Sequence, residues 1–169
     1  DTIETIIEKT PENRQTLLFS ATCPKQIKKI ANSIMQDPVM VKAPSLHDSS
    51  IIQQHFYTTS DPYRLTALRL LLQHFRSEST VIFCNTKKET QQVADALSQN
   101  HYNALALHGD LEQRDRDKTL VRFANKSVSV LVATDVAARG LDINAIDMVI
   151  NYHIAHDPEV LLHRIGRTG

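Results

Sequence analysis

The sequence predicts an α/β fold in which helices cover both faces of a parallel sheet. Short runs that are apolar throughout, such as 81–84 and 104–107, alternate with segments whose apolar residues recur at helical spacing. Strands that are apolar on both faces are typical of buried parallel sheets. Polar residues directly follow several of these runs, and ligands of such sheets bind beyond the carboxyl ends of the strands. We therefore expect the functional residues at that edge.

The individual elements are predicted from the same two patterns, taken along the chain. We expect buried strands at 16–19, 39–41, 81–84, 104–107, 128–133 and 148–150, with a further candidate strand at 52–58. Helices are expected at 24–36, 65–75, after 86, at 111–125 and at 159–165. Pro24 and Pro62 suit first helical turns, because proline lacks an N–H that a first turn leaves unpaired. The stretch 43–50 (APSLHDSS) is not periodic and is predicted to be a linker.

Composition excludes several classes of protein. The 169 residues carry 19 basic and 19 acidic side chains, so a nucleic-acid partner would need a local site rather than a global positive field. No apolar run reaches the ~18 residues of a membrane span, and no signal peptide is predicted from the acidic, amphipathic start. The two cysteines lie far apart, which favours a reducing cytosol over a disulfide framework. The chain lacks an initiator Met and stops at Arg-Thr-Gly, so we expect it to be a fragment of a longer protein.

The segment 133–142 (ATDVAARGLD) is the first candidate site. Thr134 offers a hydroxyl and N–H groups at a predicted helix N-terminus, which suits a phosphate. Gly140 permits a sharp turn, and Asp142 can accept a hydrogen bond from a ribose hydroxyl. The alternative is an ordinary capped helix in which Asp135 is a solvated acid.

The segment 163–167 (HRIGR) is the second candidate site. Arg164 and Arg167 lie three residues apart, which is about one helical turn. The planar guanidinium suits phosphate oxygens, and such an arginine can neutralise charge during phosphoryl transfer. The alternative is a pair of surface arginines at a frayed end.

The remaining signals are weaker. No GxxxxGK(S/T) phosphate loop is present, so nucleotide chemistry would have to be completed elsewhere. The charged run 113–118 either brings Arg114 or Arg116 to a phosphate backbone or forms a solvated face with local ion pairs. Ser20 and Thr22, taken alone, indicate a cap for the following helix. The eight histidines lack the Cys or acidic partners of a zinc site, so no metal site is predicted.

Taken in order, these motifs resemble the second half of a DEAD-box RNA helicase. The resemblance covers nearly the whole chain and rests on the segments 20–22 (SAT), 81–86 (VIFCNT), 108–110 (HGD) with Gln113 and Arg116, 133–142, and 163–169 (HRIGRTG). The run 107–143 is also similar to bacterial helicases that act on ribosomal RNA. The resemblance implies a tail of a first, ATP-binding RecA-like domain at 1–42, a linker at 43–50, and a second RecA-like domain of the P-loop NTPase type at 51–169, truncated at its last motif.

The resemblance also implies a role for each matching position. Arg167 is the expected catalytic residue, as the first arginine finger; a second finger is expected after Gly169. The residues expected to contact ATP are Gly140, Asp142 (at the ribose) and Arg167. The residues expected on the RNA phosphate path are Thr86, Gly109, Arg116 and Thr134. The residues expected to couple the two domains are Ser20, Thr22, His163 and Arg164.

The function implied for the full-length parent is ATP-dependent unwinding of RNA duplexes or remodelling of RNA–protein complexes, with ribosomal RNA maturation as a candidate process. Its cofactor would be ATP with Mg²⁺ held by the missing first domain. Its partners would be RNA and that first domain, in the cytoplasm and without a membrane. Because the adenine-reading glutamine motif, the phosphate loop and the DEAD tetrapeptide are absent, this fragment alone is expected to be inactive. The alternatives are a DNA-directed superfamily 2 helicase and a non-catalytic RNA-binding or scaffold protein that retains the fold.

Overall fold

The structure, a computed structural model, describes residues 2–20, 25–41, 52–138, 146–155 and 157–168. The chain divides into two compact units, Asp1–Leu46 and His47–Gly169. The division falls inside the segment 43–50 that was predicted to be a linker, although that segment lies outside the described residues. Three of the predicted site residues also lie outside them, namely Thr22, Gly140 and Asp142.

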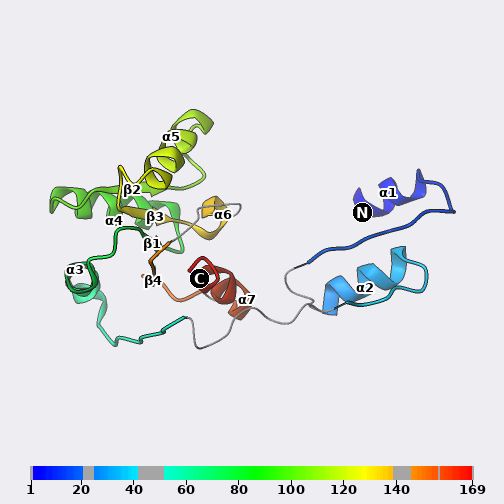
Figure 1. Cartoon of the computed structure of the whole chain (residues 1–169), viewed down its shortest axis with the longest axis horizontal. Helices are drawn as coiled ribbons and strands as arrows, with labels where there is room; N and C mark the ends of the chain where they lie inside the picture. Colours follow the sequence, from blue (N-terminus) through cyan, green and yellow to red (C-terminus); the bar gives the residue numbers. More distant parts are fainter. Residues whose placement is uncertain (1, 21–24, 42–51, 139–145, 156, 169) are drawn as a thin grey trace. The chain divides into compact units, whose positions relative to one another are not determined.

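The second unit is built on a four-stranded parallel sheet with the order β2-β3-β1-β4 (Figure 1). Its strands are β1 (Thr80–Phe83), β2 (Ala104–Leu107), β3 (Val130–Ala133) and β4 (Met148–Asn151). Thr80 lies opposite both Val130 and Met148, and Val130 lies opposite Ala104, so the first residues of the four strands are in register. The carboxyl ends of all of them therefore meet at one edge of the sheet.

Helices cover both faces of this sheet. They are α3 (Arg64–Phe75, after a 3-10 turn at Asp61–Tyr63), α4 (Lys87–Gln99), α5 (Gln113–Ala124), α6 (Asp135–Ala138) and α7 (Pro158–Ile165). Successive strand residues point to opposite faces, and two hydrophobic clusters result. One holds Ile82 with residues of α3 and α4, and the other holds Val81 with Phe123 of α5 and two alanines of α6. The predicted fold class is confirmed.

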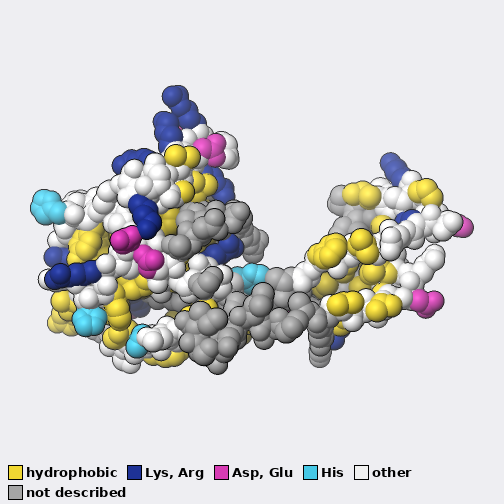
Figure 2. All heavy atoms as spheres, viewed as in Figure 1, with side chains coloured by type: hydrophobic (Ala, Val, Ile, Leu, Met, Phe, Trp, Pro, Cys, Tyr) yellow, Lys and Arg dark blue, Asp and Glu magenta, His cyan; other side chains and the backbone are white. Residues whose placement is uncertain are grey.

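The first unit contains two helices, α1 (Thr2–Glu8) and α2 (Lys25–Ile34), and the strands predicted at 16–19 and 39–41 are wrong. Both segments are outside any sheet, and Phe19 and Val39 are 88% and 85% exposed. An apolar run forms a strand only where neighbouring strands take up its backbone hydrogen bonds. No strand in the described part of the chain does this for either segment. Figure 2 shows many hydrophobic side chains on the visible surface of this unit.

The candidate strand at 52–58 is also absent, for the same reason. The segment pairs with no described strand, and Phe56 is 89% exposed. His55 makes a ring contact with Phe75 of α3, with the centroids 6.0 Å apart.

In the described part of the chain, no helix combines the length and the apolar character that crossing a membrane requires.

Candidate functional site

A buried arginine, Arg164 of α7, joins the carboxyl ends of three strands. Its side chain is 1% exposed. Nε and Nη2 donate to the two carboxylate oxygens of Asp135, which follows β3, at 2.6 and 2.7 Å. Nη1 donates to Asn151 Oδ1 at the end of β4 (3.1 Å) and to the His153 carbonyl (2.7 Å), and Nη2 also donates to Asn85 Oδ1 after β1 (3.1 Å). Each of the five N–H donors of the guanidinium thus has a partner.

This network decides between the alternatives for Arg164 and Asp135. The guanidinium also lies over the Phe83 ring, with its carbon 5.0 Å from the ring centroid. A buried charge is costly unless it is paired and its hydrogen bonds are satisfied, as they are here. Arg164 is therefore not a surface arginine, and Asp135 is not simply a solvated acid. The side chain of Arg164 is enclosed within the second unit, and its predicted place at a domain interface stays a prediction.

The other two residues predicted in this motif lie on helix α7 (His163) and just after its end (Arg167). The helix begins at Pro158, where Asp157 caps it by accepting a hydrogen bond from the Glu159 N–H at 2.8 Å. His163 is exposed. Arg167 follows the end of the helix, is half-buried, and its N–H donates to the Arg164 carbonyl at 3.3 Å. The anchoring of Arg164 therefore also sets the position of Arg167.

Three of the residues predicted on the RNA path follow three adjacent strands. Thr86 follows β1, Gly109 follows β2, and Thr134 follows β3, which lies between the other two. Because the strands are parallel, the structure places all three residues at one edge of the sheet.

Each of these three residues has a different local setting. Thr86 is the N-cap of α4: its hydroxyl accepts from the Glu89 N–H (3.2 Å) and donates to the Glu89 carboxylate (2.7 Å). The Thr134 N–H donates to the Leu107 carbonyl at 3.2 Å, whereas the Thr134 hydroxyl bonds to no other described residue. A Cβ built on Gly109 would meet Lys87 Cε at 3.5 Å, an ordinary contact. The backbone itself therefore gives no steric reason for glycine at this position.

The phosphate site predicted at a helix N-terminus after Thr134 stays a prediction. Helix α6 is described over Asp135–Ala138, and the residues that follow it lie outside the described part of the chain. The Thr134 N–H is also already used within the sheet edge. The hydroxyl of Thr134, a residue that is 8% exposed, is a candidate phosphate contact.

The residues of the charged run on α5 have different local contacts, and the phosphate contact predicted for the run stays a prediction. Arg116 is half-buried, and its Nη2 donates to the Ala137 carbonyl of α6 at 2.9 Å, so it ties α5 to the segment after β3. The rest of the run forms local pairs, such as Lys118 with Asp115 at 3.0 Å. Arg114 is exposed. Figure 2 shows Lys and Arg side chains gathered over α5, at the top of the view.

Sequence reasoning missed several residues of this edge. Asn151, Lys87 and Glu89 were not singled out. Asn151 follows an apolar run just as Asn85 does, so the same positional rule would have found it. The roles of Lys87 and Glu89 depend on partners that lie outside their own segment, Asp110 and His153, and the local pattern does not reveal them.

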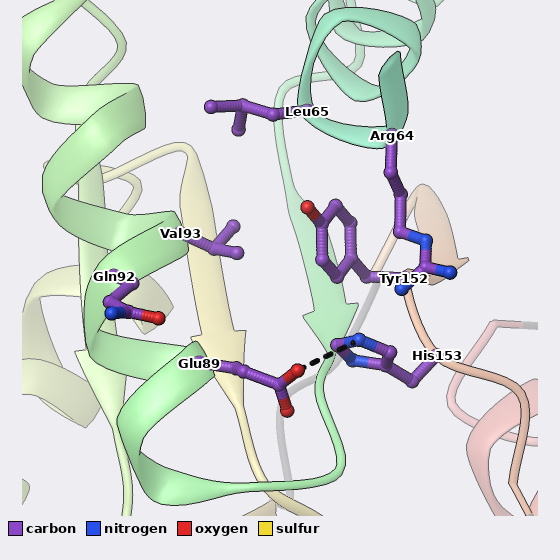
Figure 3. A pocket seen from close by; sticks show the side chains of 7 residues that line it. All are labelled: Arg64, Leu65, Glu89, Gln92, Val93, Tyr152 and His153. Carbon is purple, nitrogen blue, oxygen red and sulfur yellow. Dashed lines mark ion pairs between the residues drawn. The ribbon is translucent and has the colours of Figure 1, made fainter. Parts of the chain in front are cut away.

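A pocket of about 210 Å³ opens beside this edge, between α3, α4 and the end of β4 (Figure 3). His153 Nε2 lies 3.2 Å from Glu89 Oε1, and the Arg64 guanidinium lies 5.6 Å from the centre of the Tyr152 ring. The pocket is lined by Arg64, Leu65, Glu89, Gln92, Val93, Tyr152 and His153.

Buried Cys84 is not a candidate nucleophile, because burial raises the pKa of its thiol to about 12.

His153 is expected to make the stability of this domain depend on pH. Burial lowers the pKa of its imidazole below the ordinary 6.5; the Glu89 carboxylate opposes the shift, and Arg64 and Arg164 add to it. The unfolded chain therefore binds the proton more tightly, so the free energy of unfolding falls as the pH drops below about 6.5 toward the folded pKa. Denaturant unfolding from pH 7.5 to 5 should show a shallower pH dependence for His153→Gln. The control His55→Gln, at an exposed site, should follow the wild-type profile. Equal profiles for His153→Gln and the wild type would contradict this account.

In the described part of the chain, no group of three or more His, Cys, Asp or Glu side chains could hold a metal ion. Hydroxyl, guanidinium and ammonium groups lie at this edge of the sheet. Groups of this kind suit phosphate oxygens.

Comparison with known proteins places this arrangement in a family. Residues 63–169 match the family described as the helicase conserved C-terminal domain. The chain is 53% identical to the ATP-dependent RNA helicase DbpA of Escherichia coli (strain K12), over 99% of this chain and 37% of that protein. It is 42% identical to the DEAD-box ATP-dependent RNA helicase RhpA of Helicobacter pylori (strain ATCC 700392 / 26695), over 100% of this chain and 35% of that protein. The chain thus spans little more than a third of the length of these relatives.

Solved structures agree with the sequence matches. A DEAD box protein from Methanococcus jannaschii is 38% identical with a TM-score of 0.68, covering 99% of this chain and 45% of that one. S. cerevisiae Dbp5 bound to RNA and ADP BeF3 is 29% identical with a TM-score of 0.85, covering 97% of this chain and 44% of that one. The predicted resemblance is confirmed: the chain belongs to the family of helicase conserved C-terminal domains, in the form found in DEAD-box proteins.

Proposed function

We propose that the full-length protein is an ATP-dependent RNA helicase and that this chain supplies its second RecA-like domain. The Arg164 network carries the proposal, because it joins the segments after β1 and β3 to α7 within one buried cluster. Those segments hold the candidate RNA residues, and α7 is followed by the candidate arginine finger. The names of the similar proteins support the same function.

RNA would be held through its backbone at the carboxyl edge of the sheet. The Thr134 hydroxyl and the open surface at Gly109 suit phosphate and sugar oxygens. Arg116 would meet the phosphate path through its remaining donors, since one donor is engaged at the Ala137 carbonyl. Contacts of this kind position a strand without reading its bases.

ATP with Mg²⁺ would supply the phosphoryl group whose transfer to water releases free energy. In this chain Arg167 would donate to the γ-phosphate, while Gly140 and Asp142 would approach the nucleotide. The magnesium ligands would belong to the first RecA-like domain. A finger on the second domain makes hydrolysis conditional on closure of the two domains.

The remaining assignments follow from the same proposal. Residues 1–42 would complete the first RecA-like domain, which agrees with their exposed apolar segments, and residues 43–50 would link it to the second. Ser20 and Thr22 would couple the nucleotide state to strand separation, and exposed His163 would meet the first domain. Similarity over 107–143 to bacterial helicases of ribosomal RNA supports ribosomal RNA maturation, in the cytoplasm, as the process.

The test is RNA-stimulated ATP hydrolysis and duplex separation by the full-length protein. We expect turnover that rises with RNA, strand separation of RNA but not DNA duplexes, and no turnover by residues 1–169 alone, since this chain has no phosphate loop. Equal activity on DNA duplexes would favour the DNA-directed alternative. RNA binding without any turnover by the full-length protein would favour the scaffold alternative. ATP turnover by the isolated chain would contradict the proposal that the first domain supplies the phosphate loop and the magnesium ligands.

A further inference from the structure

We propose that Lys87 contacts an RNA phosphate group and that Asp110 occupies the place of this phosphate in the RNA-free protein. The inference rests on the proposed function, since it concerns the same RNA path. It adds two residues that neither the motifs nor the comparisons assign to that path.

The position of the Lys87–Asp110 pair is the first observation. Lys87 opens α4 just after Thr86, and Asp110 follows Gly109 after β2. Lys87 Nζ lies 2.5 Å from Asp110 Oδ1. Because β3 lies between β1 and β2 in the sheet, this pair spans the carboxyl end of β3, which leads to Thr134. The ammonium group therefore lies among the three candidate phosphate contacts.

The packing of the lysine is the second observation. Its Cε and Nζ would lie 3.5 and 3.8 Å from a Cβ built on Gly109. The lysine side chain thus runs along the glycine that is expected to let the RNA backbone approach. A phosphate at Gly109 would therefore lie next to this ammonium group.

The hydrogen bonds of Thr86 explain why a lysine is needed there. The single proton of the Thr86 hydroxyl is already donated to the Glu89 carboxylate, and the oxygen accepts from the Glu89 N–H. Donating to a phosphate would break the hydrogen bond from the Thr86 hydroxyl to the Glu89 carboxylate and bring the phosphate toward that carboxylate. The Lys87 ammonium has three donors, and Asp110 is the one partner that it has among the described residues.

The Asp110 carboxylate is also easily replaced by another anion as the partner of Lys87. The two side chains are 54% and 64% exposed, and exposed ion pairs contribute little net free energy in water. The hydrogen bond from Lys87 lowers the pKa of Asp110, so the carboxylate is charged at neutral pH. The Asp110 N–H donates to His108 Nδ1 at 3.4 Å, which holds the loop while the side chain is free to turn away. A phosphate oxygen can then accept the hydrogen bond of the Lys87 ammonium in place of the Asp110 carboxylate oxygen.

The test is binding of labelled single-stranded RNA by the full-length protein, with a non-hydrolysable ATP analogue, over a series of salt concentrations. Lys87→Gln should raise the RNA Kd about threefold to tenfold and lower the slope of log K against log salt by about 0.7, the loss of one phosphate contact. Asp110→Asn should lower the Kd, because no competing carboxylate remains. In the Lys87→Gln background, Asp110→Asn should have no further effect.

A matched control lies at the opposite edge of the sheet. Lys126 and Glu78 form a similarly exposed pair (Nζ–Oε2 2.6 Å) before β3 and β1. Lys126→Gln and Glu78→Gln should leave both the Kd and the salt slope unchanged. The inference is overturned if Lys87→Gln behaves like Lys126→Gln while the unaltered protein binds RNA, a result that leaves the proposed function standing. It is also overturned if Asp110→Asn still tightens binding without Lys87, because the carboxylate would then act by general repulsion. Absence of RNA binding by the unaltered protein would overturn the proposed function and this inference together.

Discussion

Replacing Arg167 by lysine is expected to lower kcat for ATP hydrolysis by the full-length protein by roughly 10³-fold. Lysine keeps the positive charge but loses the planar fork that can meet two phosphate oxygens at once. An arginine finger acts mainly on the transition state, so the RNA Kd should stay within about twofold of the wild-type value. Steady-state ATP turnover at saturating RNA, together with RNA titration at fixed salt, measures both quantities.

Arg114→Lys is the matched control for this substitution. Arg114 is exposed on α5, remote in sequence from α7, and its replacement should leave kcat unchanged. If Arg167→Lys leaves kcat within about twofold while RNA binding collapses, Arg167 belongs to the RNA site rather than the ATP site.

Removing the buried charge of Arg164 should cause the largest loss of stability. Arg164→Met leaves the Asp135 carboxylate, and the amide oxygens of Asn85 and Asn151, without their donor. Breaking a buried pair in this way typically costs about 3–5 kcal/mol of the free energy of unfolding. Adding Asp135→Asn to Arg164→Met should recover part of that loss, because the uncompensated charge is then removed. Denaturant unfolding of the three variants measures the effect.

The control for Arg164 is Arg122→Met on the exposed face of α5, which should change the free energy of unfolding by no more than about 0.5 kcal/mol. Arg164→Lys should fall between the two, because lysine keeps a charge for Asp135 but has three donors instead of five. A loss below about 1 kcal/mol for Arg164→Met would show that the network does not hold α7 in place.

The sequence was sufficient to predict the sheet of the second unit. Runs such as 81–84 and 130–133 are apolar on both faces, and only a sheet covered on both sides can bury them. The same reasoning failed at 16–19 and 39–41, which are equally apolar. Whether an apolar run becomes a strand depends on partners elsewhere in the fold, and the run itself carries no information about them.

The edge of the sheet that carries the site was also predictable, but the different roles of the residues at that edge were not. Polar residues after strands indicated the carboxyl edge, and the structure places Thr86, Gly109 and Thr134 there. The sequence motif does not distinguish Arg164 from Arg167, yet Arg164 is enclosed and Arg167 is half-buried. That difference arises from partners on three separate strands, which local spacing does not reveal.

The most direct measurement is the RNA-concentration dependence of ATP turnover for Thr134→Ala and Arg167→Lys, made in parallel in the full-length protein. We predict that Thr134→Ala raises the RNA concentration needed for half-maximal turnover more than it lowers kcat at saturating RNA. Arg167→Lys should do the reverse. This outcome would show that RNA and ATP are held by separate residues of one domain. If both substitutions shift the same parameter by similar factors, the assignment of separate RNA and ATP contacts to the ends of β3 and α7 is wrong.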